Sequence, residues 1–311
     1  MCCLFGLIDD HQGLTGREKS RILSVLSSAC EVRGTDATGI AYNTGGTLHI
    51  YKRPVPAHRL HLRIPETARV ILGHTRMTTQ GSAKRNYNNH PFLGAAGKDV
   101  FALAHNGVLY NDRILRSGLH LPKTNIQTDS YIAVQLIEQK KALNFDSLRY
   151  MAEQVEGSFT FTVLDRRDRL YVVKGDNPFC LFYFPSMGIY LYASTEEILR
   201  RAISRMGMEG LATCRVPLNC GEILRIDRDG ALTRSKFDDY RLFAGWQDAL
   251  WGSPCRNSQE KPCHPQESER YLEEIKSVAA AFGYAPGEID RLSEMGFSPE
   301  ELEEFLYCGE L

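Results

Sequence analysis

The 311-residue sequence predicts an α+β protein in which two packed β-sheets are flanked by helices. Several short strand-like segments and a few helical ones occur in groups rather than in strict alternation. A second set of strand-like segments, separated by short polar or glycine-containing turns, follows the central helices and is typical of antiparallel pairing. The hydrophobic fraction of 43% is ordinary for a globular chain.

The first part of the chain is expected to begin with a strand and a capped helix. Residues 2–8 form an apolar run typical of a strand, and residues 15–34 have helical spacing. Thr15 and Glu18 predict a capping box, because a threonine and a glutamate three residues later satisfy two backbone N–H groups at a helix start. Further extended segments are expected at 39–44, 46–53, 68–76 and 99–108.

The next part of the chain predicts two helices and then the second group of strands. The helices are expected at 129–141 and 146–155. Ser194 and Glu197 predict a capping box for a further helix at 194–203. The strands of the second group are expected at 159–165, 169–175, 180–184 and 189–194.

Composition changes near residue 240 and predicts three parts. Residues 2–240 are expected to form the main domain, the polar and proline-bearing stretch 241–266 a linker or lid, and residues 267–311 a small helical extension. The Met-Gly-Phe loop in the extension resembles ubiquitin-associated modules. A helical hairpin that packs on its own domain is the alternative, because short helices usually need tertiary packing.

Charge and hydropathy exclude several classes of partner. The formal net charge is -1, so no overall field favours nucleic acid or an anionic membrane surface. No apolar run approaches the roughly 20 residues that span a bilayer, and the N-terminus does not resemble a signal peptide. A cytoplasmic protein is therefore expected. Most of the nine cysteines should be buried free thiols, among them Cys30, Cys180, Cys214 and Cys220.

The opening sequence MCCLFG places a cysteine directly after the initiator methionine. Removal of Met1 would leave Cys2 with a free α-amino group beside its own thiol, a nucleophile with a base built in. Neighbouring side chains of a strand point to opposite faces, so at most one of Cys2 and Cys3 lines a given pocket. The alternative is that both are small buried hydrophobic residues.

Four polar stretches stand at the ends of apolar runs, where sites tend to be built. Arg76 offers a planar fork suited to a carboxylate, and Asp129 can hold an ammonium group. Asn106 and Gly107 offer a side-chain amide and an approachable backbone N–H, the usual parts of an oxyanion hole. Together they fit an amino-acid substrate with a reactive acyl group, such as glutamine. The stretches are 32–41, 72–81, 88–92 with 104–111, and 127–133.

These motifs, in this order, resemble those of the class II glutamine amidotransferases, which are N-terminal nucleophile hydrolases. The resemblance covers roughly residues 2–220 and is closest to the glutaminase domains of glucosamine-6-phosphate synthase and amidophosphoribosyltransferase. It implies a four-layer αββα sandwich, no cofactor and no metal. The motifs are Cys2, RG-x-D-x-x-G at 33–39, GHTR at 73–76, HNG at 105–107 and TD at 128–129.

The resemblance also implies a chemistry. Cys2 would attack the side-chain amide of glutamine, releasing ammonia and leaving a γ-glutamyl thioester that water converts to glutamate. Asn106 and Gly107 would stabilise the oxyanion. Such domains are usually fused to a synthase, and the rest of this chain is too short for one, so a separate ammonia-accepting synthase is the expected partner. The remaining implied roles are substrate binding by Arg76, Thr79 and Asp129 and structural support by Arg33 and Gly34.

Other interpretations remain open. Arg76 and Asp129 could form a structural ion pair, and Asn106-Gly107 could be a simple turn. A non-catalytic glutamine-binding protein would be expected to lose the nucleophile or the oxyanion residues, whereas a Cys2 amidase for other amides would not need both Arg76 and Asp129. Buried neutral histidines are a better reading of His74, His90 and His105 than a metal site, and Cys255, Cys263 and His264 offer only a faint zinc pattern.

Two positions depart from the family pattern. Met77 stands where many members have an aromatic residue, and Gln80 stands where sugar-synthesising members often have a histidine. The loop that covers glutamine is therefore expected to close differently here.

Overall fold

The computed structural model describes residues 2–242, 272, 275–276, 279, 285–294 and 302. The chain divides into two compact units, Met1–Gly252 and Ser253–Leu311. The predicted linker at 241–266 lies outside the described residues, apart from 241–242.

The first unit contains two antiparallel sheets. One has seven strands in the order β11-β9-β10-β1-β4-β2-β3, so that β1 lies between β10 and β4. The other has six strands in the order β13-β12-β8-β7-β6-β5. The seven-stranded sheet consists of β1 (Cys3–Asp9), β2 (Ala37–Thr44), β3 (Thr47–Arg53), β4 (Val70–Arg76), β9 (Cys180–Phe184), β10 (Ile189–Ala193) and β11 (Cys214–Arg215). The six-stranded sheet consists of β5 (Phe92–Ala96), β6 (Asp99–Leu109), β7 (Gly157–Asp165), β8 (Leu170–Lys174), β12 (Glu222–Ile226) and β13 (Leu232–Lys236).

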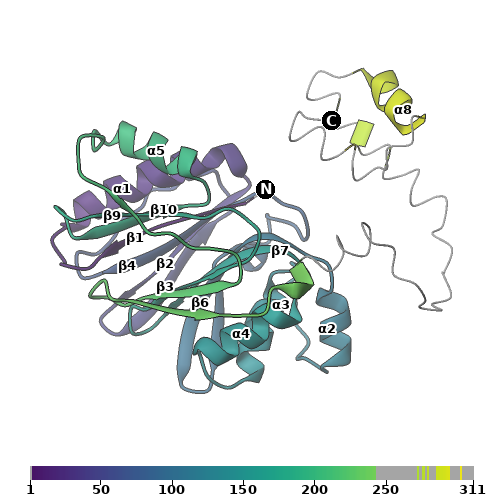
Figure 1. Ribbon diagram of the computed structural model, residues 1–311, viewed down its shortest axis with the longest axis horizontal. Coiled ribbons are helices and arrows are strands. Elements are labelled where there is room, and N and C mark those ends of the chain that lie inside the picture. The colour runs from purple at the N-terminus through teal and green to yellow at the C-terminus, as the bar shows by residue number, and fades with distance from the viewer. Residues whose placement is uncertain are drawn as a thin grey trace. The chain divides into compact units, whose positions relative to one another are not determined.

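Helices cover the outer faces of both sheets (Figure 1). Helices α1 (Gly16–Ala29) and α5 (Glu196–Arg205) lie on the seven-stranded sheet, and α3 (Tyr131–Gln139) and α4 (Phe145–Gln154) lie on the six-stranded sheet, with α2 (Asp112–Gly118) beside them. The four-layer αββα sandwich is thus confirmed. Short 3-10 turns at Cys30–Arg33, Ala57–Arg59 and Asn86–Asn88 connect these elements.

Three apolar clusters fill the spaces between the four layers. Alternation along β1 shows how a single strand serves two of them. Cys3, Phe5 and Leu7 are buried in the cluster that contains the apolar face of α1, whereas Leu4 and Ile8 are buried in the cluster between the sheets. A third cluster packs α3 and α4 against the six-stranded sheet.

Cap residues set the starts of two helices, α1 and α5. The predicted capping box of α1 is confirmed, because Thr15 accepts from Glu18 N and Glu18 accepts from Thr15 N. The predicted capping box with Ser194 and Glu197 is wrong. Thr195 is the N-cap of α5, and buried Ser194 instead accepts a hydrogen bond from Leu4 N of β1 at 2.8 Å.

A fully buried ion pair stabilises the α1 side of the sandwich. Lys19 Nζ lies 2.9 Å from Asp9 Oδ2, and both side chains are 0% exposed. The ammonium also donates to the backbone oxygens of Glu66 and Ala68. Asp9 in turn accepts from the N–H groups of the turn that leads into α1. Both charges are therefore fully hydrogen-bonded, as a buried pair requires.

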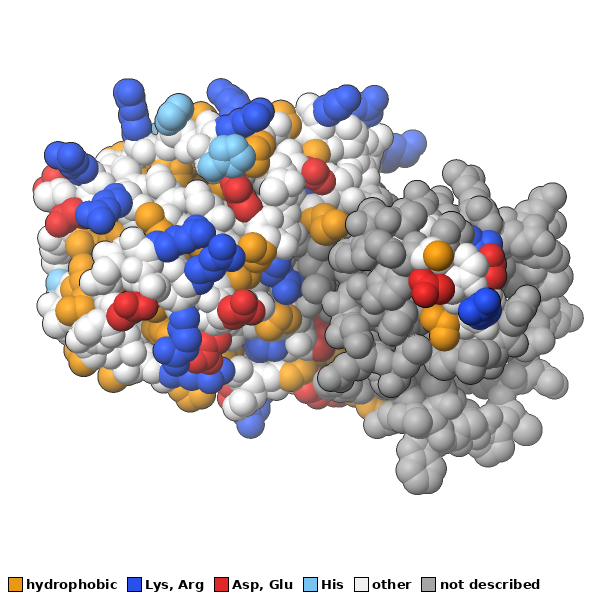
Figure 2. Space-filling view, turned by 90° about the horizontal axis from the view of Figure 1, so that it is seen from above, with side chains coloured by type: hydrophobic (Ala, Val, Ile, Leu, Met, Phe, Trp, Pro, Cys, Tyr) orange, Lys and Arg blue, Asp and Glu red, His pale blue; other side chains and the backbone are white. Residues whose placement is uncertain are grey.

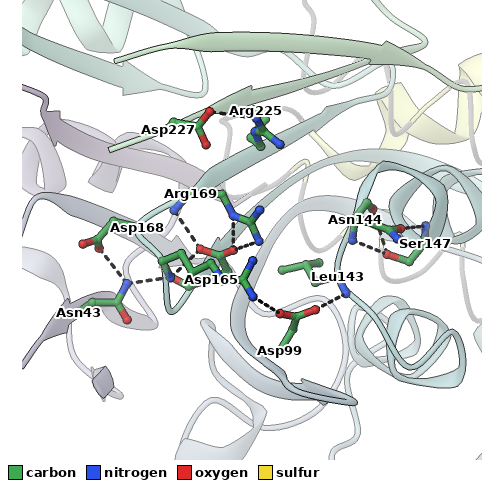
Figure 3. A network of polar contacts seen from close by, with 11 residues as sticks. Asn43, Asp99, Leu143, Asn144, Ser147, Asp165, Asp168, Arg169, Arg225 and Asp227 are labelled. Atoms are coloured by element: carbon green, nitrogen blue, oxygen red, sulfur yellow. Dashed lines mark hydrogen bonds and ion pairs between the residues drawn. The ribbon is translucent and has the colours of Figure 1, made fainter. Parts of the chain in front are cut away.

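A polar network joins the two sheets at one end of the sandwich (Figure 3). Asn43 of β2 donates to the backbone oxygen of Asp165 and to the carboxylate of Asp168, each at 2.8 Å. Asp165 also holds the turn between β7 and β8 through Arg169. In the same region, Asp99 accepts from Leu143 N ahead of α4. Asp99 begins β6, whereas the HNG motif lies near the other end of that strand.

On the face shown in Figure 2, hydrophobic side chains are scattered among charged and other ones. No helix within the described part of the chain is long and apolar enough to cross a membrane. The second unit contains α8 (Pro286–Glu294) and a small core of Ile275, Ala279, Ile289 and Leu302. The Met-Gly-Phe loop lies outside the described residues, so its resemblance stays a prediction.

Candidate active site

Cys2 directly precedes β1 and is 9% exposed. By alternation its side chain is on the face of Leu4, between the sheets, whereas Cys3 is buried against the helix layer beside Cys30. The Cys2 thiol donates to Met77 O at 3.4 Å. Burial raises the pKa of this thiol, which the nearby Arg76 charge lowers and the Asp129 charge raises. Cys2 thus lies within electrostatic range of both predicted substrate-binding residues.

The RG-x-D-x-x-G motif places the strand that carries Arg76 against the start of β1. Arg33 Nε donates to Cys2 O at 3.0 Å. Gly34 packs on backbone, because a Cβ there would lie 2.5 Å from the carbonyl carbon of Arg76 and 2.6 Å from Met77 N. Asp36 accepts from Thr78 N at 2.7 Å. The motif therefore fixes the position of residues 76–78 relative to Cys2.

The guanidinium of Arg76 is 2% exposed and holds the following loop. Its Nη1 donates to Asn89 Oδ1 at 2.6 Å, and its Nη2 donates to the backbone oxygens of Gln80 and Gly81 at 2.6 and 3.0 Å. The structural ion pair with Asp129, which was the alternative to substrate binding, is not formed as a direct contact. The Nη2 group instead binds two carbonyl oxygens of the loop that carries Met77, Thr79 and Gln80.

Asn106 and Gly107 lie on β6, which contacts both β1 and β4. His74 of β4 pairs with Leu4 of β1, and its Nε2 lies 3.0 Å from the backbone oxygen of His105 on β6. These two contacts bring this part of β6 against the Cys2 end of β1. The side-chain nitrogen and oxygen of Asn106 are buried without a hydrogen-bond partner. Asn177 supports the segment by donating to Asn106 O at 3.2 Å.

Gly107 has a backbone that only glycine fits. Its φ of 142° lies in the region that disfavours other residues, and a Cβ would lie 1.8 Å from Ser158 O. A side chain at this position would therefore collide with the backbone of the neighbouring strand β7.

Asp129 is 3% exposed and fixed at both carboxylate oxygens. Oδ2 accepts from Leu109 N at 2.7 Å, and Oδ1 accepts from Ser130 Oγ at 3.3 Å. Ser130 Oγ also lies 2.8 Å from His105 Nδ1. The backbone N–H of Asp129 donates to the side-chain oxygen of Gln80 at 3.1 Å. Gln80 therefore joins Asp129 to the loop of residues 76–81, named the glutamine loop because it is expected to cover the substrate.

Three histidines form a buried group between the sheets. The rings of His74 and His90 have centroids 4.2 Å apart, and His105 stacks on Phe161. Burial lowers the pKa of His74 to about 3 and also lowers those of His90 and His105. These rings are therefore neutral near pH 7. Within the described ranges no three His, Cys, Asp or Glu side chains are placed to hold a metal ion, and Cys255, Cys263 and His264 lie outside those ranges.

The structure thus brings together most of the predicted site and adds residues that were not predicted. Cys2, Arg76, Asn106, Gly107 and Asp129 gather where β1, β4 and β6 meet, while Thr79 is exposed on the loop. Five residues that fix this geometry were not predicted to belong to the site. Four of them stand inside or next to the motif stretches, a signal that could have singled them out. They are Asp36, Asn89, His105, Ser130 and Asn177.

Comparisons with known proteins identify a family and several relatives. Residues 74–201 match the family model of a glutamine amidotransferase domain. The chain is 24% identical over 209 residues to 7-cyano-7-deazaguanine synthase from Sulfolobus acidocaldarius, covering 63% of this chain and 44% of that protein. It is 30% identical over 186 residues to glutamine–fructose-6-phosphate aminotransferase from Halalkalibacterium halodurans, covering 57% and 30%. The chain therefore spans less than half the length of these relatives.

Solved structures share the fold. Glutamine phosphoribosylpyrophosphate amidotransferase from B. subtilis aligns with a TM-score of 0.58 at 19% identity, covering 76% of this chain and 49% of that one. A structure described as the allosteric regulatory enzyme of purine biosynthesis aligns with a TM-score of 0.61 at 20% identity, with the same coverage. The family match over residues 74–201 shows that this chain carries a class II glutamine amidotransferase domain, and the solved structures show the fold alone.

Proposed function

We propose that this chain hydrolyses the side-chain amide of glutamine through a Cys2 thioester and supplies the ammonia to a separate synthase. The nucleophile would be the Cys2 thiol, the oxyanion donors Asn106 and Gly107, and the substrate-binding residues Arg76, Thr79 and Asp129. Glutamine as substrate is implied by the amidotransferase domain.

The observation that carries the proposal is the unpartnered amide of Asn106. A buried donor without a partner costs about 1–3 kcal/mol, so natural proteins rarely leave one without a use. Both polar atoms of this side chain are buried and unpaired, on a strand packed against the start of β1. An oxyanion that forms during attack by Cys2 would supply the missing acceptor.

The proton balance requires a base close to a thiol that burial keeps protonated. With Met1 removed, the α-amino group of Cys2 takes the thiol proton as sulfur attacks the amide carbon of glutamine. The C–N bond then breaks, and the leaving nitrogen takes that proton and departs as ammonia. Water attacks the thioester, regenerates the thiol and releases glutamate.

Substrate binding requires a change in the glutamine loop. Arg76 Nη2 already donates to Gln80 O and Gly81 O, so a substrate carboxylate at this edge of the fork must replace those two acceptors. The ammonium group of glutamine would bind the fixed carboxylate of Asp129. Loop opening and closure would then accompany each turnover.

A separate synthase is proposed because of the relatives. Two matched relatives are a synthase and an aminotransferase, and this chain covers 44% and 30% of their lengths. The cysteines that the structure describes are free thiols, which agrees with the reducing cytoplasm as the proposed location. Cys30 and Cys180 are buried as expected, whereas the expectation is wrong for Cys214, which is exposed, and for Cys220, which is only partly buried.

The test compares adjacent cysteines. Cys2→Ala should abolish glutamate release from glutamine while the thermal unfolding temperature stays close to that of the wild type, and Cys3→Ala should retain most activity. Asn106→Ala should lower kcat by roughly 100-fold or more. Intact mass of the active protein should lack Met1. Activity in Cys2→Ala, or full activity with Met1 retained, would exclude this mechanism.

A second measurement separates this reading from its alternatives. Glutamine should be preferred over glutamine amidated at its α-carboxylate, because that change removes the partner of Arg76. A protein that binds glutamine without releasing glutamate would be the binding protein, and equal use of unrelated amides would indicate a general Cys2 amidase.

A further inference from the structure

A pocket of about 870 Å³ lies between helix α2 and the segment that follows it. Small-molecule sites typically have volumes of about 300–1,000 Å³, so this pocket is large enough for a metabolite. It is called the basic pocket here and is defined by Arg113, Arg116, His120, Lys123, Thr124 and Asn125.

The lining of the basic pocket has one sign of charge. It contains two arginines, a lysine and a histidine, and no Asp or Glu. The chain as a whole has a formal net charge of -1, so this concentration is local. On the face shown in Figure 2, by contrast, basic and acidic side chains are intermixed.

Two of the cations are not neutralised by the protein. Arg113 and Lys123 are exposed, and neither forms an ion pair within the part of the chain that the structure describes. Arg116 is partly compensated, because its Nη2 lies 3.8 Å from Asp112 Oδ2. A pocket with two uncompensated cations and one partly compensated cation favours an anion with several negative oxygens.

Neutral groups beside these cations also suit such an anion. Thr124 Oγ1 accepts from Ile126 N at 3.1 Å, which leaves its hydroxyl proton to donate. The amide of exposed Asn125 offers two further N–H groups. A guanidinium fork and neutral donors together match a phosphate better than a single carboxylate.

We propose that the basic pocket binds a small molecule that carries phosphate groups. The concave shape and the apolar side chains of Leu121 and Pro122 in the lining favour a compact ligand over an extended acidic segment of a protein.

Hydrogen bonds connect the basic pocket to the candidate active site. Arg116 Nη2 donates to Thr128 O at 3.2 Å, directly before Asp129. Gln127 and Asn88 exchange two hydrogen bonds, from Gln127 N at 2.9 Å and from Asn88 Nδ2 at 3.1 Å. Asn88 Nδ2 also donates to Ser82 O, just after the glutamine loop.

A ligand that repositions Arg116 is therefore linked to Asp129 and to the glutamine loop. This second part of the proposal, regulation of glutamine hydrolysis, rests on the proposed function, whereas ligand binding does not.

The test uses pyrophosphate as probe, with isothermal calorimetry on the full chain at constant ionic strength. We expect a dissociation constant in the millimolar range or tighter. The double variant Arg113→Gln/Lys123→Gln should weaken binding by about 30-fold, since each of the two lost charge-assisted contacts contributes on the order of 1 kcal/mol and every 1.4 kcal/mol is tenfold. The matched control Arg17→Gln/Arg21→Gln removes two exposed charges from α1 and should bind like the wild type.

Two further measurements locate the site and test the coupling. Pyrophosphate should protect Lys123 from acetylation by an amine reagent, as read by peptide mass spectrometry. It should change the rate of glutamine hydrolysis by about fivefold in the wild type and have little effect in the double variant. If pyrophosphate binds but the rate of glutamine hydrolysis does not change, only the regulatory part of the proposal is excluded. If the chain hydrolyses no glutamine at all, the proposed function is contradicted, and calorimetry still tests ligand binding in the basic pocket.

Binding that is equal in both double variants, or absent, would overturn the proposal. Tight binding of a poly-glutamate peptide without binding of pyrophosphate would overturn it in favour of an acidic protein partner.

Discussion

Gly34→Ala should lower glutaminase activity while the fold survives. Gly34 has extended backbone with a φ of 172°, a conformation that alanine adopts readily, so the substitution acts only through its added methyl group. That methyl would lie 2.5 Å from the carbonyl carbon of Arg76 and 2.6 Å from Met77 N. These neighbours are backbone atoms, which cannot move aside as a flexible side chain can.

The size of the effect follows from the distance that must be gained. Carbon atoms pack at about 3.5–4.0 Å, so the end of β4 must move by about 1 Å relative to Gly34. Met77 accepts from the Cys2 thiol and Arg76 is a proposed substrate-binding residue, so the shift falls on the reacting groups. A misplacement of 1 Å can cost about 100-fold in rate. Overpacking should cost about 1–3 kcal/mol of unfolding free energy.

The assay is glutamate release at several glutamine concentrations, with thermal unfolding of the same samples. We expect kcat/KM to fall about 100-fold and Tm to fall by about 2–4 °C for each kcal/mol lost. Gly13→Ala is the control, because nothing lies within 4 Å of a Cβ there. If Gly34→Ala retained activity within a few-fold of Gly13→Ala, the assumption that this contact sets the position of Arg76 and Met77 would be refuted.

Three further predictions concern stability and substrate binding. Lys19→Met should lower the free energy of unfolding by about 3–5 kcal/mol, because it leaves buried Asp9 charged and without its cation. The control Arg17→Gln, on the exposed face of α1, should change it by about 0.5 kcal/mol or less. Both values are measured by denaturant unfolding. The free energy of unfolding should fall as pH drops below about 6.5, the pKa of a histidine in the unfolded chain. Below that pH the unfolded state binds protons at His74 and His90, whereas burial lowers the pKa of His74 to about 3 and also lowers that of His90 in the folded state. A Tm that stays constant from pH 7 to pH 5 would contradict this. Ser130→Ala removes the hydrogen bond to Asp129 Oδ1 and should raise KM for glutamine about fivefold with little change in kcat, so a fall in kcat alone would show that Ser130 acts on the chemistry instead.

Local patterns predicted much of the fold and of the candidate site. Alternation in β1 placed Cys2 and Cys3 on opposite faces, because the side-chain period of a strand depends only on neighbouring residues. The capping box of Thr15 and Glu18 likewise involves residues three apart. The motif stretches also supplied the residues that meet where β1, β4 and β6 converge.

Contacts between distant segments account for what the sequence left out. Ser194 and Thr195 are both good N-cap residues, and the choice depends on a hydrogen bond from Leu4 N, 190 positions away in the chain. The partners of Arg76 are a backbone loop and Asn89, neither of which a residue pattern specifies. The buried Lys19–Asp9 pair was missed because a lysine in a helical pattern is normally solvated.

The position of β1 between β10 and β4 has a consequence for the order of events during synthesis. Strand β4 is made early, but the other edge of β1 pairs Phe5 with Ala193 and so stays unpaired until residues 189–193 are made. At about 5–20 residues per second, the ribosome needs roughly 10–40 s to make the intervening chain. Once the sheet closes, Cys2 is only 9% exposed. An aminopeptidase that removes Met1 would therefore have to act while the strand is still unpaired, and translation speed would set the fraction of molecules that mature.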